Sequence, residues 1–389
     1  MPPARRPVRL LVLALLLCGL PAGCAAPGAG AADAAVRRAV ADWAAAPPAR
    51  LAGIPLAGWS YEVSSVRRDG VRAFARAVLH YRLAGYDTAA ADARREVELA
   101  GDGAGGWRVA ADRPAPGAPP QLWDQGAVTA VRGAHALVLG VGQAPQTLSG
   151  IAAEADRAVP AVSAAWPRPW AGRLVVLVPG TLDAMAALLG QPADAYRGMG
   201  AVTTGRVGAG PAPADRVVIN PEGYAGLSEA GRGIVLTHEV THVATRAATS
   251  ATTPLWLSEG FADWAAYRAT DRTPAEAAPE LARAVRRGEL PGALPADGDF
   301  AFGGDPEALA RSYEGAWLAC RLIAAKWGDA ALVRLYEEAG RAPCPWPWTK
   351  AWGRTGGTHP ALARGPAGAA RVGASGTLAG DAQDADRDQ

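Results

Sequence analysis

The sequence predicts an α+β protein with two folded domains behind an export signal. In the first third of the chain, a helix-spaced segment is followed by strand-like stretches. Proline and glycine then interrupt the pattern, and apolar strand-like runs followed by long helical stretches come after them. The 389 residues suit two or three domains, and a hydrophobic content of 50% excludes global disorder.

Residues 1–24 have the three parts of a secretory signal. Three arginines precede an apolar run over residues 10–20, which is too short to span a bilayer as a helix. The small residues just before Cys24 resemble a bacterial lipobox, so we expect Cys24 to carry a lipid. The chain would then be exported and anchored at the outer face of the cytoplasmic membrane. The alternative is an ordinary cleaved signal with an incidental cysteine.

The charge balance argues against a nucleic acid partner. The formal net charge is +2, and without residues 1–23 the chain has 36 basic and 37 acidic side chains. Binding to phosphates needs a concentrated basic face, which this balance does not supply. Beyond the signal, Cys320 and Cys344 are the cysteines of the mature chain. A disulfide between them and a buried free thiol at Cys320 are equally compatible with the sequence.

The first folded domain is predicted over residues 33–113, after a tether at 25–32. Residues 33–46 have helical spacing with Asp33 as N-cap. Strand-like stretches follow at 59–66, 71–83, 94–99 and 107–111, and Asp69-Gly70 is a hairpin signal. One long helix followed by a curled antiparallel sheet resembles the cone-shaped nuclear transport factor 2-like fold. That resemblance implies small-molecule binding or protein contacts; the alternative is a generic α+β spacer.

The second domain is predicted over residues 122–342, with the proline-rich residues 112–122 as the boundary. The pattern predicts, in chain order, a hairpin over 127–139 around Gly133, a helix at 148–166 and buried strands at 173–178 and 216–220. It then predicts helices at 231–246, 255–268, 276–287 and 312–327, followed by a disordered tail at 343–389.

The strongest functional signal is the sequence H-E-x-x-H at residues 238–242, preceded by an apolar run. His238 and His242 are four residues apart, so a helix places both imidazoles on one face, where they can bind one metal ion. Glu239 is rotated by about 100° from His238 around the helix axis. This position suits a general base that takes a proton from a water activated by the metal.

A third ligand and its support are predicted in the next helix. Catalytic zinc needs three protein ligands and one open position. Glu259 lies seventeen residues after His242, beyond a loop long enough to reverse the chain, so it can face the histidines. Asp263 is four residues further on, on the same helix face, where it can accept the remaining N–H of a ligating histidine.

The H-E-x-x-H segment and the later W-L-S-E-G-F-A-D-W resemble the gluzincin metallopeptidases, the group that includes thermolysin and the zinc aminopeptidases. They resemble more closely the actinobacterial lipoproteins with a peptidase MA-like domain. The resemblance covers roughly residues 215–330. It implies that His238, His242 and Glu259 bind one zinc ion, that Glu239 is the general base and that Asp263 orients His238.

The same resemblance implies three further features. Tyr313 would donate to the oxyanion of the tetrahedral intermediate, although a packing role for this tyrosine is equally open. The strand at 216–220 would be the edge strand that binds an extended peptide. The chain lacks the G-x-M-E-N segment of zinc aminopeptidases, and the helices that would close the C-terminal side of the site are missing because the composition turns irregular after Gly340.

The sequence therefore predicts an exported zinc metallopeptidase with a peptide or protein substrate. One alternative is a catalytically silent, surface-anchored lipoprotein that keeps the zinc fold for stability or for binding peptides or other ligands. A second alternative assigns the main role to a small-ligand pocket in the first domain.

Overall fold

The computed structural model describes residues 29–205, 208, 210–302, 304–341 and 373–376. Its architecture is mixed α and β, as the sequence predicts. The export signal, Cys24, Cys344 and most of the predicted tail lie outside the described residues. Within the described residues, no helix is long and apolar enough to cross a membrane.

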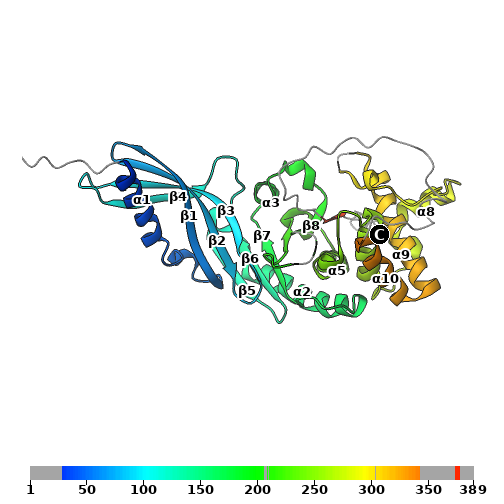
Figure 1. The fold of residues 1–389 in the computed structure, drawn as a ribbon. Coiled ribbons are helices and arrows are strands. Elements are labelled where there is room, and N and C mark those ends of the chain that lie inside the picture. Colours follow the sequence, from blue (N-terminus) through cyan, green and yellow to red (C-terminus); the bar gives the residue numbers. More distant parts are fainter. Residues whose placement is uncertain (1–28, 206–207, 209, 303, 342–372, 377–389) are drawn as a thin grey trace, which may run out of the picture.

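The N-terminal part is one helix on a four-stranded antiparallel sheet (Figure 1). Its elements are α1 (Ala29–Trp43), β1 (Leu56–Asp69), β2 (Arg72–Leu83), β3 (Ala91–Gly101) and β4 (Trp107–Pro114). Val36 and Val40 of α1 are fully buried against Ala73 and Val97 of the sheet. Gly70 turns the first hairpin with a φ of 59°, as the Asp-Gly pair predicts. The predicted tether at 25–32 is helical from Ala29 onward, so that boundary is corrected.

A six-stranded mixed sheet forms the centre of the molecule, in the order β10-β8-β9-β7-β6-β5. The strands are β5 (Val128–Arg132), β6 (Ala136–Val141), β7 (Leu174–Val178), β8 (Met199–Thr204), β9 (Arg216–Ile219) and β10 (Gly373–Gly376). Strands β6, β7 and β9 run parallel, and the other pairs are antiparallel. The hairpin around Gly133 and both predicted buried strands are confirmed.

Two expectations about strands are wrong. The stretch 216–220 is not an edge strand, because β9 lies between β7 and β8. Val217, Val218 and Ile219 are all buried, as the continuous apolar run of an interior strand requires. The tail predicted as disordered over 343–389 contains β10, which pairs with β8 at the sheet edge.

Helices surround this sheet and build the C-terminal half. They are α2 (Pro145–Ala165), α3 (Leu182–Leu189), α4 (Pro221–Ala225), α5 (Glu229–Thr245), α6 (Leu255–Tyr267), α7 (Pro274–Ala277), α8 (Pro279–Arg286), α9 (Pro306–Trp327) and α10 (Asp329–Arg341). The helix predicted at 276–287 is broken at Ala278, because Pro279 disfavours helical geometry at the residue before it. No helix is predicted from the sequence between residue 327 and Gly340, but α10 lies there and packs Leu332 and Tyr336 into the core. The residues after Gly340, where closing helices are expected to be missing, lie almost entirely outside the described residues.

The two sheets share one hydrophobic cluster. Tyr81 and Leu83 of the first sheet pack with Trp123, Leu139 and Val175. A buried cluster of charged side chains holds the proline-rich connection between the two sheets in place. Arg95 is 1% exposed and binds Asp112 at 2.9 Å and Asp124 at 2.6 Å. The connection between the sheets is thus fixed by packing and ion pairs.

A buried carboxyl group on α9 holds the start of α8. Glu314 is 3% exposed and accepts the backbone N–H groups of Glu280 at 3.2 Å and Leu281 at 2.6 Å. Burial, followed by the contact with the Glu280 side chain, raises the pKa of Glu314 from 4.5 to about 8. The folded state therefore keeps this proton at pH values where the unfolded chain releases it.

This raised pKa predicts a pH-dependent stability. The stabilisation of the folded state by the protonated Glu314 side chain is complete below about pH 4.5 and is lost as the pH rises through about 8. Between pH 5 and 8, the free energy of unfolding of the native protein should fall by about 3–4 kcal/mol relative to Glu314→Gln. Urea unfolding of both proteins across this range measures the difference, and parallel pH profiles would contradict the prediction.

Candidate metal centre

Helix α5 presents the H-E-x-x-H segment from a buried position. The hydroxyl group of Ser228 caps the helix by accepting the N–H of Gly231 at 3.1 Å. Apolar residues on α5 pack against α2, α6 and the sheet, which fixes the rotation of the helix about its axis. As a result His238, Glu239 and His242 are 1%, 0% and 7% exposed.

The turn between α5 and α6 is held by α10. The Thr249 hydroxyl lies 2.8 Å from the hydroxyl of Tyr336, and the Thr252 hydroxyl donates to the carbonyl oxygen of Ala339 at 2.8 Å. The turn returns the chain so that α6 packs on α5, and Glu259 in the first turns of α6 is 4% exposed. The helix that the sequence did not predict therefore helps to position the predicted third ligand.

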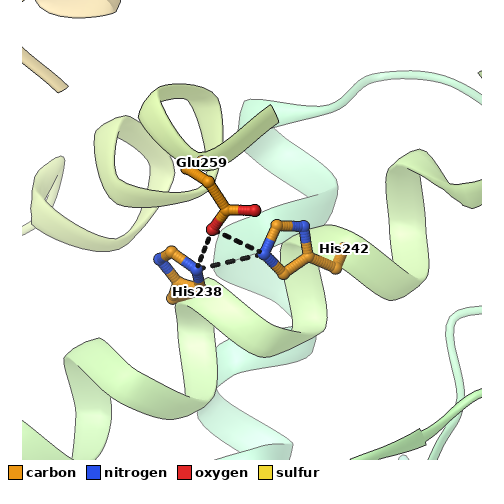
Figure 2. Close-up of side chains that lie close together, drawn as sticks. All are labelled: His238, His242 and Glu259. Carbon is orange, nitrogen blue, oxygen red and sulfur yellow. Dashed lines mark hydrogen bonds and ion pairs between the residues drawn. The ribbon is translucent and has the colours of Figure 1, made fainter. Parts of the chain in front are cut away.

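The two histidines and the glutamate converge on one point (Figure 2). The Nε2 atoms of His238 and His242 are 3.0 Å apart. Oε2 of Glu259 lies 3.3 Å from Nε2 of His238 and 3.4 Å from Nε2 of His242. Figure 2 shows the carboxylate reaching from α6 toward both imidazoles on α5. This buried group could hold a metal ion.

The spacing of these three atoms fits zinc. Tetrahedral zinc keeps nitrogen and oxygen ligands about 2.0–2.2 Å away, which separates neighbouring ligand atoms by about 3.3 Å. The observed separations of 3.0, 3.3 and 3.4 Å match that triangle. Oε2 of Glu259 is also buried without accepting a hydrogen bond. A cation is the ordinary partner for a buried carboxylate oxygen in that position.

The electrostatic balance of the site favours a cation as well. Three carboxylates, from Glu239, Glu259 and Asp263, act on the buried imidazole of His238. Burial alone would raise the pKa of Glu259, but the electrostatic interaction with His242 and the contact with His238 outweigh it and lower the pKa to about 2. Burial likewise opposes the charged form of His238, yet Asp263 and the two glutamates raise its pKa well above the ordinary value. The site is thus built to surround positive charge.

Asp263 contacts His238 as the sequence predicts. Its Oδ1 lies 2.7 Å from Nδ1 of His238, and because a carboxylate can only accept, Nδ1 carries the proton. In the neutral ring, Nε2 then keeps its lone pair toward Glu259 and His242, as a metal ligand requires.

We expect Asp263→Asn to weaken zinc binding by about 10–100-fold, since the amide supports this tautomer less well than the carboxylate does. Competition with a fluorescent chelator measures the affinity. Glu338→Gln, on the exposed side of α10, is the matched control and should bind zinc like the native protein. An unchanged affinity in Asp263→Asn would show that Asp263 does not support the ligand.

Glu239 follows His238 on α5, its charge acts on the imidazole of His238, and its side chain is held from the sheet. The hydroxyl group of Thr203 on β8 donates to Oε2 of Glu239 at 2.6 Å and also lies 3.2 Å from its backbone oxygen. Thr203 is fully buried, so this contact fixes the carboxylate. Sequence reasoning missed Thr203. The β-branched Val202, Thr203 and Thr204 between glycines at 200 and 205 are the signal that could have indicated strand β8.

Tyr313 lies in the second turn of α9 and is 7% exposed. Its ring packs edge-to-face on Phe300, with 5.2 Å between centroids. Burial is the main cause that raises its pKa, and the charges of Glu259, Asp263 and Glu239 add to it. Tyr313 therefore packs in the core, and the charges that act on it show that it also lies near the metal-binding group. Cys320 lies two helical turns after Tyr313 on α9 and is a buried free thiol.

Comparison of the chain with protein-family models, with curated proteins and with solved structures finds no match. The assignment of a function rests on the geometry of the site.

Proposed function

We propose that the protein is a zinc metallopeptidase that hydrolyses peptide bonds. The single observation that carries this proposal is the convergence of His238, His242 and Glu259 on one buried point, with Glu239 next to His238 on the same helix. Two imidazoles and one carboxylate form the ligand set of a catalytic zinc site, which leaves a fourth position for water or substrate. A structural zinc site would instead use four protein ligands.

The chemistry that zinc supplies at such a site is Lewis acidity, which polarises a carbonyl group and lowers the pKa of water. The carboxylate of Glu239 takes the proton of the attacking water and passes it to the leaving amine. Thr203 holds that carboxylate in place through its 2.6 Å hydrogen bond. Tyr313 is the candidate donor to the oxyanion of the tetrahedral intermediate. Asp263 fixes the ring of His238.

The proposal extends to fold family and location. The helix pair α5 and α6 beside a mixed sheet supports a gluzincin-type peptidase domain, and α1 on a four-stranded antiparallel sheet supports a nuclear transport factor 2-like domain. The sequence of the leader supports export with a lipid anchor at Cys24. The substrate would then be a peptide or protein outside the cytoplasmic membrane.

Zinc-loaded protein incubated with a mixed peptide library tests the function, with cleavage products identified by mass spectrometry. We expect new peptide termini that disappear after chelation and return when zinc is added back. Absence of cleavage from protein that holds one zinc per chain would overturn the proposal. Tight stoichiometric peptide binding in that case would identify a catalytically silent binding protein instead.

A further inference from the structure

The chain covers the edge of its own central sheet with a short strand from its C-terminal region. Residues Gly373–Gly376 form β10, which pairs antiparallel with β8. Gly373 lies opposite Thr203, Ala374 opposite Val202, and Gly376 opposite Met199. Without β10, strand β8 would be the outer strand on this side of the sheet, next to β9.

This edge is the one nearest to the candidate metal centre. Thr203, the partner of Gly373, donates its hydroxyl hydrogen to the carboxylate of Glu239. Strand β10 also contacts α5, which carries both histidines, and α9, which carries Tyr313. In Figure 1 the red segment of β10 lies beside β8, close to α5. Four residues of extended backbone therefore pass directly beside the groups to which the peptidase function is assigned.

An exposed strand edge binds extended peptides through backbone hydrogen bonds, with little demand on the sequence of the added strand. The sequence of β10, Gly-Ala-Ser-Gly, has no side chain larger than that of serine. Such a segment supplies the backbone donors and acceptors that complete β8 and little else. An extended substrate that pairs with β8 would need the same donors and acceptors.

We propose that residues 373–376 occupy in cis the edge at which an extended peptide substrate pairs with β8, so that the C-terminal segment competes with substrate for the site. The proposal rests on the peptidase function and adds a regulatory element to it. The competitor is the chain itself, and substrate gains access when β10 leaves the edge.

The length of the connection sets the expected size of the effect. Residues 342–372 link α10 to β10. Because the competing segment belongs to the same chain, we take its effective concentration at the edge as on the order of 1 mM. Release of β10 should therefore lower the apparent KM by about 3- to 30-fold and leave kcat unchanged, because a competitor in cis affects only the binding of substrate.

The test uses full-length protein with the double substitution Ala374→Pro and Ser375→Pro. In an antiparallel pair, alternate residues donate their backbone N–H to the partner strand. Proline has no backbone N–H, so two adjacent prolines remove a hydrogen bond to β8 whichever of the two residues donates it. The matched control is Ala374→Ser with Ser375→Ala, which keeps every backbone donor. We expect the lower KM in the proline variant and native kinetics in the control. Equal KM values in both variants would overturn the proposal.

A binding measurement keeps this test separate from that of the peptidase function. A fluorescent synthetic peptide with the sequence of residues 369–380 is titrated into each protein, and its anisotropy is followed. We expect the proline variant to bind it at least about 3-fold more tightly than the native protein and the control do. Equal binding by all three proteins would overturn cis occupancy. Absence of hydrolysis by every protein, with the binding difference intact, would overturn the peptidase function alone.

Discussion

Replacing Glu239 by glutamine is expected to reduce kcat for peptide hydrolysis by about 1000-fold, the effect of removing a general base, while zinc stays bound. The amide has the shape of the carboxylate but cannot accept a proton at neutral pH. Its carbonyl oxygen can still accept the hydrogen bond from Thr203, so the side chain should keep its place. Binding of zinc depends on the other three side chains.

Steady-state kinetics and metal analysis of Glu239→Gln, run side by side, check this prediction. A glutamine variant that hydrolyses peptides at the native rate would remove Glu239 from the mechanism. Loss of zinc together with activity would show that Glu239 belongs to the ligand set.

Replacing Gly260 by alanine is expected to lower the free energy of unfolding by about 2–4 kcal/mol, because the added methyl group overpacks a closed interface. A Cβ atom at this position would lie 2.3 Å from the carbonyl oxygen of Ala316 and 3.0 Å from Sγ of Cys320. Helix α6 would have to move away from α9. Gly260 directly follows Glu259, so that shift would also displace the third ligand and weaken zinc binding.

The matched control for this substitution is Gly233→Ala on α5. There the nearest atom to an added Cβ, Oε2 of Glu154, is 3.6 Å away, which is ordinary contact. Alanine in that helix position should stabilise the protein by up to about 1 kcal/mol. Urea unfolding of both variants with bound zinc measures the two effects. Equal stability of Gly260→Ala and the native protein would contradict the close packing of α6 on α9.

The ligand group could be predicted from the sequence because its geometry is local. His238 and His242 are related by one helical turn, and so are Glu259 and Asp263, so two short segments define most of the site. The reversal between them needs only a loop of suitable length. The structure brings His238, His242 and Glu259 to one point and places Asp263 on His238, in agreement with that expectation.

The parts that the sequence did not reveal depend on contacts between distant segments. Thr203 contacts Glu239 only because β8 pairs with β9, and the register of that pair is not encoded within either strand. Strand β10 has a sequence of small residues with no strand propensity, so only its partner β8 makes it a strand. The edge position expected for residues 216–220 came from the resemblance to gluzincins, whereas their continuous apolar run indicates the interior position that β9 has between β7 and β8.

Metal analysis of the purified protein beside its His238→Ala variant tests the central claim most directly. The account predicts about one zinc ion per chain in the native protein and almost none in the variant, because removal of one of three ligands opens the site. Near-native secondary structure of the variant by circular dichroism would confirm that the loss is local. Native protein without zinc after growth in zinc-supplemented medium, or equal zinc contents in both proteins, would contradict the account.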